Sequence, residues 1–292
     1  MRGHVILLAA FVTLFLILWA ILYAVLPLTR RGRGFGAGLV ARLSVRYTRM
    51  TGFADWAKAY GVIVLVVIGG VMLIGWAGDT FLDLAQEVHS HSPKLQHIDS
   101  VVHAWAVSRR SPGATTFFTT MSAIGGPVGL AVLVLGVAIV LLLVGRFRWV
   151  LYLTVTVGGG ALLNEALKLY FARGRPDIAE MLRQARGYSF PSGHAMGSTV
   201  VFGALSYLAF RTATQWRWKA GAVALGATIV LAVSLSRVYL GAHWISDVIA
   251  GVAAGTLWVV VSTISYETGR RIRLLRAIQR EARSSVRAAR GA

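Results

Sequence analysis

The amino-acid sequence predicts an all-α, polytopic membrane protein, and three observations lead to this fold class. The chain of 292 residues is 56% hydrophobic and only 14% charged, whereas soluble domains carry about a quarter charged residues. Its apolar residues gather in long runs, most of them long enough to cross about 30 Å of hydrocarbon as a helix. Its Lys and Arg residues gather in short clusters between those runs, as expected for loops that face anionic lipid.

Seven apolar segments are predicted to be transmembrane helices. They lie near Val5–Leu28, Tyr60–Ala77, Phe118–Val144, Val150–Tyr170, Gly193–Phe210, Ala220–Leu235 and Trp244–Ile264. The sixth is the shortest unless residues 236–240 extend it. The chain is thereby divided into an N-terminal transmembrane segment (1–28), a basic amphipathic linker (29–59), a core (60–265) and a basic tail (266–292).

The distribution of basic residues predicts the orientation in the membrane. The segments 29–59, 145–149, 211–219 and 268–292 hold 20 of the 30 Lys and Arg residues, and they share one side if every span crosses once. By the positive-inside rule that side is cytoplasmic, which places the N-terminus outside and the tail inside. A cleaved signal peptide over the first span is the alternative, but it would leave the Arg-rich linker outside.

Composition also narrows the chemistry and the partners. The chain has no cysteine, which excludes disulfides, thiolate catalysis and Cys-ligated metals. The net charge of +19 would suit nucleic-acid binding only if it formed a polar basic face. Because the charge lies between apolar spans, we expect membrane lipids as partners and no nucleic acid.

The first candidate motif lies at the end of the fourth span. Lys168 and Arg175 precede Pro176, and together they offer a point charge and a bidentate fork for a dianion. Pro176 disfavours helical geometry at Arg175, so the helix should stop there. Two interfacial anchors that reach toward the headgroups would look the same.

The second candidate motif, Pro191-Ser192-Gly193-His194, opens the fifth span. Ser192 is a preferred N-cap residue, and a helix N-terminus binds anions through its free N–H groups. His194 is placed to protonate a leaving oxygen. An ordinary helix start with an interfacial histidine is the alternative.

The third candidate motif comprises Ser236, Arg237, His243 and Asp247. A spacing of four residues stacks His243 and Asp247 on one helix face. A carboxylate bonded to one imidazole nitrogen leaves the other free to attack an electrophile. A polar pair favoured by the helix dipole is the alternative.

Counting spans places all three motifs on the extracytoplasmic side. Because that count used only hydropathy and loop charge, it supports their convergence independently of the motifs themselves. The motifs resemble the three signatures of the type 2 phosphatidic acid phosphatase (PAP2) superfamily: Lys, six residues, Arg-Pro; Pro-Ser-Gly-His; and Ser-Arg, five residues, His, three residues, Asp. Every position is filled, in the right order. The resemblance covers about 60–264 and implies a six-helix core, with one extra N-terminal span.

The resemblance also implies a role for each residue. His243 would be the nucleophile that forms a phosphohistidine, and Asp247 would orient it. His194 would be the general acid for the leaving group and then the base for water. The phosphoryl oxygens would be bound by Lys168, Arg175, Ser192, Gly193 and Arg237. With three fixed cations, no metal or other cofactor is expected.

The expected function is hydrolysis of a lipid phosphomonoester or diphosphate at the outer face of a bacterial plasma membrane. Candidate substrates are phosphatidic acid, phosphatidylglycerol phosphate, polyprenyl diphosphate and the phosphates of lipid A. A phosphotransferase would carry identical motifs. Vanadium haloperoxidases share them too, but the resemblance makes those enzymes soluble, against seven apolar spans.

Four histidines crowd the loop between the second and third spans, at positions 89, 91, 97 and 103. They invite a zinc-site interpretation. Their spacing matches no metal pattern, and no cysteine supports it, so solvated loop histidines are the preferred interpretation.

Overall fold

The computed structural model describes residues 13, 16, 70–176, 181–182 and 187–291. Most of the first predicted span, the basic linker and the start of the second span lie outside this part of the chain. Residues 70–89 are helical, so the second predicted helix continues well past Ala77. The extension follows from packing, because Ala85 and Val88 are buried in a cluster with Leu95 and Phe190.

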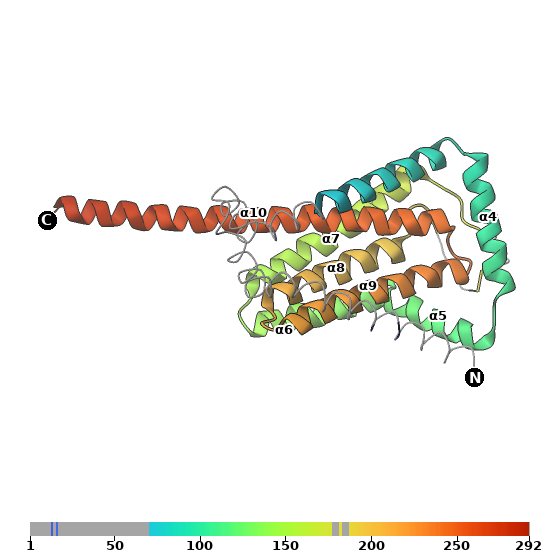
Figure 1. Ribbon diagram of the computed structural model, residues 1–292, viewed down its shortest axis with the longest axis horizontal. Coiled ribbons are helices and arrows are strands. Elements are labelled where there is room, and N and C mark those ends of the chain that lie inside the picture. The colour runs from blue at the N-terminus through green and yellow to red at the C-terminus, as the bar shows by residue number, and fades with distance from the viewer. Residues whose placement is uncertain (1–12, 14–15, 17–69, 177–180, 183–186, 292) are drawn as a thin grey trace, which may run out of the picture.

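The described chain is a helical bundle with a long projecting helix (Figure 1). Its elements are α4 (Pro93–Ser108), α5 (Pro112–Ile124), α6 (Pro127–Leu143), α7 (Phe147–Phe171), α8 (Gly193–Thr212), α9 (Trp216–Tyr239) and α10 (Ile245–Gly291). Within the described residues, α7, α9 and the Ile245–Arg273 part of α10 are long and apolar enough to cross a membrane. The chain is therefore a multi-pass membrane protein, as predicted, and α9 does include residues 236–239.

The third predicted span, Phe118–Val144, is divided into two helices. The helices α5 and α6 meet at an angle of 50°, with Gly125 and Gly126 between them and Pro127 opening α6. A Cβ on Gly125 would lie 2.2 Å from a methyl carbon of Val233. The break thus lets the backbone of this span pass directly against α9.

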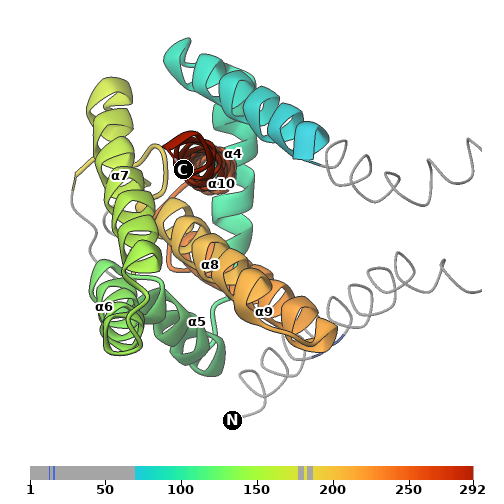
Figure 2. The same ribbon diagram turned by 90° about the vertical axis from the view of Figure 1, so that its left-hand side faces the viewer.

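The helix α8 occupies the centre of the bundle, where it packs against α7, α9 and α10 (Figure 2). Small residues allow this close packing in a membrane protein. A Cβ on Gly255 of α10 would lie 2.8 Å from Thr199 Cβ, and one on Gly251 would lie 2.8 Å from the Ser192 carbonyl oxygen. Because these two glycines have no side chain, α10 can approach the start of α8 closely.

The helix α4 runs across the end of the bundle at which α8 and α10 begin (Figure 1). The side chains of Ile98, Val101 and Trp105 lie on the exposed face of this helix. The opposite helix face is buried and includes Leu95, Asp99 and His103. We refer below to this end of the molecule as the α4 end.

The last helix does not stop at the predicted end of its span. The backbone of α10 remains helical from Ile245 to Gly291, a length of 47 residues. Figure 1 shows it extending beyond the other helices, away from the α4 end. The backbone of the basic tail is thus helical up to Gly291.

Candidate active site

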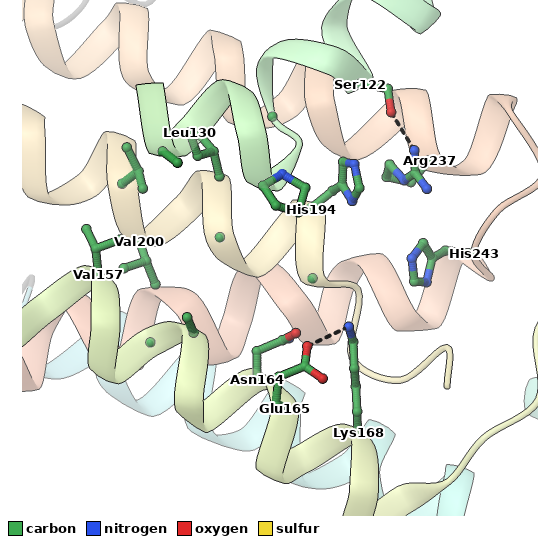
Figure 3. A pocket seen from close by; sticks show the side chains of 18 of the residues that line it. Ser122, Leu130, Val157, Asn164, Glu165, Lys168, His194, Val200, Arg237 and His243 are labelled. Atoms are coloured by element: carbon green, nitrogen blue, oxygen red, sulfur yellow. Dashed lines mark hydrogen bonds and ion pairs between the residues drawn. The ribbon is translucent and has the colours of Figure 1, made fainter. Parts of the chain in front are cut away.

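The three predicted motifs meet around one cavity of about 620 Å³ at the α4 end. Figure 3 shows its side chains. All three motifs contribute to its lining, through Lys168, Arg175, Gly193, His194, Arg237 and His243. Deeper in the bundle the lining becomes apolar, with Leu130 from α6, Val157 from α7 and Val200 from α8. The cavity is therefore lined by polar and charged side chains at one end and by apolar side chains at the other.

His243 lies in the turn between α9 and α10, which Gly241 makes possible with a φ of 71°. Its side chain is 2% exposed. Nε2 lies 3.0 Å from Arg175 Nη1, and since a guanidinium can only donate, Nε2 must accept. The ring proton is thereby assigned to Nδ1, which faces Asp247 Oδ2 at 3.5 Å. This separation is longer than an ordinary hydrogen bond.

Electrostatics keep the His243 ring neutral. Burial lowers its pKa well below the usual 6.5, and the nearby charges of Arg175, Arg237 and Lys168 lower it further. A neutral imidazole with its proton on Nδ1 has a lone pair on Nε2. His243 is thus in the form that a nitrogen nucleophile requires.

Asp247 lies in the first turn of α10 and is fully buried. Its Oδ2 also accepts the Trp244 backbone N–H at 3.1 Å, which fixes the carboxylate against the His243 turn. Its Oδ1 accepts a hydrogen bond from Arg173 at 2.6 Å. Arg173 in turn contacts Asp99 of α4 at 2.7 Å.

The basic motif begins in the last turn of α7, which ends four residues earlier than Arg175. The cause is Ala172, which adopts left-handed geometry with a φ of 43°; Pro176 therefore does not set this helix end. The Arg175 guanidinium is fixed by carbonyl oxygens of Gly187, Tyr188 and Ala242 at 2.7–3.0 Å. Lys168 Nζ lies 3.0 Å from Glu165 Oε1, one turn earlier.

The second motif forms the N-terminus of α8, with Ser192 at the N-cap as predicted. The Ser192 side chain makes no capping hydrogen bond. It is fully buried, and its Oγ has no hydrogen-bond partner in the described part of the chain. A Cβ on Gly193 would lie 3.3 Å from Lys168 Nζ. The glycine therefore lets the lysine ammonium approach the free end of the helix.

Arg237 and His194 complete the cavity wall. Arg237 is 4% exposed and donates through Nη1 to the Ser122 hydroxyl of α5 (Figure 3). His194 points into the cavity beside the break between α5 and α6 (Figure 3). A Cβ on Gly126 would lie 3.4 Å from His194 Nε2. The break thus leaves room beside this nitrogen.

Polar residues of the site that the sequence analysis missed include Asn164, Ser122, Asp99 and Arg173. Arg173 lies within the spacing of the basic motif, so its position offered a signal. Asp99 and Ser122 lie on helices outside the motifs, and nothing in the local sequence distinguishes them from ordinary helix residues.

The outer-loop histidines do not line the cavity at which the three motifs meet. His91 and His97 line a second cavity, of about 610 Å³. His103 is buried and packs edge-on against Trp244, with ring centroids 5.6 Å apart. In the described part of the chain, no group of three or more His, Cys, Asp or Glu residues is arranged to hold a metal ion.

Comparison with known proteins agrees with this geometry. Residues 149–271 match the family model of the PAP2 superfamily. The chain is 29% identical over 178 residues to phosphatidylglycerophosphatase B of Bacillus subtilis (strain 168), covering 61% of this chain and 86% of that protein. It is 41% identical over 81 residues to an undecaprenyl-diphosphatase of Sulfolobus acidocaldarius, covering 28% of this chain and 34% of that relative.

A solved structure has a similar fold. It is the crystal structure of a transmembrane PAP2-type phosphatidylglycerolphosphate phosphatase from Bacillus subtilis, with a TM-score of 0.62 and 27% sequence identity. The alignment covers 68% of this chain and 96% of that structure. The match thus includes nearly all of the neighbour.

Proposed function

We propose that this chain, which belongs to the PAP2 superfamily of phosphatases, hydrolyses a lipid phosphate ester or diphosphate through a phosphohistidine on His243. The observation that carries the proposal is the buried, neutral imidazole of His243 among three cations. Lys168, Arg175 and Arg237 line the same cavity as His243. Such a cluster stabilises a phosphoryl group and offers it a nucleophile.

Binding of the phosphoryl group uses the groups that converge at the polar end of the cavity. The three cations neutralise its oxygens, and the Ser192 hydroxyl and the Gly193 N–H donate to them at the α8 N-terminus. The incoming oxygens take over the Arg175 N–H that Nε2 of His243 accepts at 3.0 Å. This exchange frees the lone pair of the nucleophile.

The first chemical step forms the bond between Nε2 and phosphorus and breaks the bond between phosphorus and the leaving oxygen. His194, protonated in the substrate complex because the phosphoryl oxygens offset the cations around it, gives its proton to that oxygen, which departs as the lipid alcohol or lipid phosphate. Positive charge develops on the His243 ring, and Asp247 stabilises it as the 3.5 Å contact shortens. Contacts of catalytic groups commonly tighten in this way during the reaction.

The second step returns the enzyme to its starting state. His194, now neutral, takes a proton from a water molecule, whose oxygen attacks phosphorus. The bond between Nε2 and phosphorus breaks, inorganic phosphate leaves, and His243 is neutral again. No metal is needed in this scheme, because Lys168, Arg175 and Arg237 supply the positive charge.

The lipid part of the substrate fits the apolar end of the cavity. Leu130, Val157 and Val200 lie on three different helices there, so an alkyl or prenyl chain would lie between α6, α7 and α8. Phosphatidylglycerol phosphate is the first substrate to test. A curated relative and a solved structure, both from Bacillus subtilis, carry that activity in their names, and the alignments with this chain cover 86% and 96% of their lengths.

The proposed location follows from the basic loops of the sequence. The α4 end would face the outside of a bacterial plasma membrane, and the basic end of α10 would lie in the cytoplasm. A phosphorylated headgroup would then enter at the outer surface while its chains stay in lipid. No protein partner or nucleic acid is part of the proposal.

The test is phosphate release in detergent, with EDTA present, from a panel of phosphatidic acid, phosphatidylglycerol phosphate and polyprenyl diphosphate. Wild type is compared with His243→Ala, His194→Ala and the control His97→Ala, which removes an exposed histidine. We expect wild type and the control to be equally active with EDTA and both other variants to be inactive. Full turnover by His243→Ala, or loss of wild-type activity in EDTA, would refute the mechanism.

The same panel separates hydrolysis from phosphotransfer. With radiolabelled substrate, a hydrolase returns all label as inorganic phosphate. A phosphotransferase instead returns label on an added lipid alcohol or on a glycerol acceptor.

A further inference from the structure

The carboxylate of Asp247 has one oxygen for His243 and one turned away from it. Oδ2 faces the imidazole and accepts the Trp244 N–H. Oδ1 accepts a hydrogen bond from Arg173 Nη1 at 2.6 Å. A carboxylate held at both oxygens cannot rotate, so the contact behind it controls how Oδ2 is directed at His243.

Arg173 is itself held in place by a second buried carboxylate. Its Nη2 lies 2.7 Å from Asp99 Oδ2, and its Nη1 also donates to the Ser246 hydroxyl at 2.7 Å. Asp99 is 1% exposed and Arg173 is 14% exposed in its side chain. The planar guanidinium thus bridges two carboxylates in a fixed geometry, which a lysine ammonium would not reproduce.

Ser246 closes this arrangement into a ring. Its hydroxyl donates to Asp99 Oδ2 at 2.6 Å, and its backbone N–H donates to Asp99 Oδ1 at 3.1 Å. Asp99 therefore accepts an N–H at the start of α10, one residue before Asp247. Three segments distant in sequence meet here, because Asp99 lies on α4, Arg173 follows α7, and Ser246 opens α10.

The charges of the ring explain why two carboxylates are present. Arg173 alone beside Asp247 would form a neutral ion pair and weaken the field that Asp247 exerts on His243. With Asp99 added, two negative charges share one positive charge. The group keeps a net charge of −1 next to the ring that becomes positive when phosphohistidine forms. Because the group is buried, its net charge interacts more strongly with the His243 ring than it would in water.

Neither Asp99 nor Arg173 is placed to bind the substrate. Both line the second cavity and are absent from the lining of the catalytic one. Each Nη of Arg173 already donates to a carboxylate. Asp99 also lies outside the residues that match the family model, 149–271. The contacts lead from Asp99 to Arg173, to Asp247 and only then to His243.

We propose that Asp99 and Arg173 are positioning residues of the catalytic reaction, which hold Asp247 in line with His243 and preserve its negative charge. This inference rests on the proposed function, since it assumes that His243 is the nucleophile. It assigns α4 a part in catalysis: the helix that crosses the end of the bundle supplies the carboxylate behind the catalytic pair.

The test is a double-mutant cycle on phosphate release with Asp99→Asn, Asp247→Asn and the pair. Asp99→Asn keeps the size and part of the hydrogen bonding but removes the charge. We expect its kcat to fall about 10- to 100-fold, the scale known for loss of a supporting carboxylate behind a metal-bound histidine, with KM within about twofold. Asp83→Asn, which changes an exposed carboxylate on the preceding helix, is the control and should match wild type.

The cycle distinguishes positioning from a merely structural role. If Asp99 acts through Asp247, adding Asp99→Asn to Asp247→Asn changes the residual rate less than about twofold, because the interaction is already lost. A lipid phosphate with a good leaving group keeps that rate measurable. An unchanged kcat for Asp99→Asn, a raised KM with unchanged kcat, or effects that multiply in the pair would each overturn the proposal.

A second variant decides the matter if Asp99→Asn does not fold, as judged by thermal unfolding in detergent. Ser246→Ala removes the hydroxyl that joins Asp99 to Arg173 but leaves every charge in place. We expect kcat about three- to tenfold lower, because the two hydrogen bonds of this hydroxyl are lost while the ion pairs of Arg173 remain, and full kcat would overturn the proposal. His243→Ala runs in parallel: if it kept turnover, the proposed function itself would fail, independently of the Asp99 result.

Discussion

The two ends of the helix bundle differ in what they bury: charged and titratable side chains at one end, and packed aromatic rings at the other. At the α4 end, Asp99, Asp247, His243 and Arg237 are all less than 9% exposed and lie around one cavity or directly behind it. At the other end, aromatic rings pack against one another with centroids 5.1–5.9 Å apart. These rings belong to Trp149, Tyr152, Tyr207 and Tyr266.

The difference separates the part of the fold that lowers its stability from a part that raises it. Buried charges are costly and are kept where they serve chemistry, whereas aromatic clusters stabilise by area and ring geometry. The aromatic end also carries an ion-pair group in which Glu267 contacts Arg211 and Arg270. We therefore expect changes at the α4 end to reduce turnover and changes at the aromatic end to reduce stability.

The largest expected effect is that of Asp247→Asn. The variant leaves the His243 ring without the charge that stabilises its protonated form, and kcat should fall about 10³- to 10⁴-fold, as for a triad aspartate. The measurement is turnover of the preferred lipid phosphate, with thermal unfolding of the same sample. A loss of activity that only followed unfolding would remove the distinction between the two ends.

A smaller effect is expected for Arg237→Lys. The ammonium keeps the charge but loses the planar fork that contacts Ser122 while facing the cavity. We expect kcat/KM to fall about 10²-fold, the scale for loss of one donor to a transition-state oxygen. Arg217→Lys, at the far end of α9, is the control. Equal rates for the two variants would show that charge alone suffices.

How far the sequence predicted these regions follows from the kind of signal that each one carries. The three motifs combine rare residue types at fixed spacings, and counting spans placed them at one end of the bundle. His243, Asp247 and Lys168 were therefore predicted to lie close together before any fold was known, and their catalytic roles stay predictions. The aromatic cluster has no such spacing, because its four rings come from α7, α8 and α10 and meet only through helix packing.

The parts that were not predicted depend on the tertiary structure. The break at Gly125 and Gly126 lies inside one continuous apolar run, which hydropathy reads as a single span. Asp99 is one acidic residue on a helix with exposed neighbours, and only the approach of α4 to Arg173 gives it a role. The early end of α7 arises from the left-handed backbone of Ala172. This conformation is uncommon for alanine, so the sequence does not predict it.

At the aromatic end, Tyr152→Ala should affect stability and leave catalysis intact. Tyr152 is 3% exposed, contacts three rings and lies 3.0 Å from Thr263 Oγ1 through its hydroxyl. Removing the ring should cost about 3 kcal/mol, and Tyr152→Phe about 1 kcal/mol. Thermal unfolding in detergent measures the loss, and kcat below the transition should equal that of wild type. A tenfold lower kcat in the folded variant would join the two ends functionally.

The smallest expected effect is one of pH, and it tests the electrostatics of the α4 end directly. Burial and the cations Arg175, Arg237 and Lys168 lower the pKa of His243, so this proposed nucleophile remains neutral as the pH falls through 6.5, the usual value for histidine. Because the pKa is lowered, the neutral, reactive form of His243 is lost only at more acidic pH. If the negative charge of Asp247 outweighed burial and the cations, the pKa would instead be raised and the neutral form would be lost at higher pH. Nuclear magnetic resonance of labelled histidine rings measures this without substrate, since the His243 signal is the one missing from His243→Ala. We expect that signal to be that of a neutral ring at pH 6.5. Titration at or above 6.5 would mean that Asp99 and Asp247 together outweigh the three cations, and that the nucleophile needs a proton removed before it can attack.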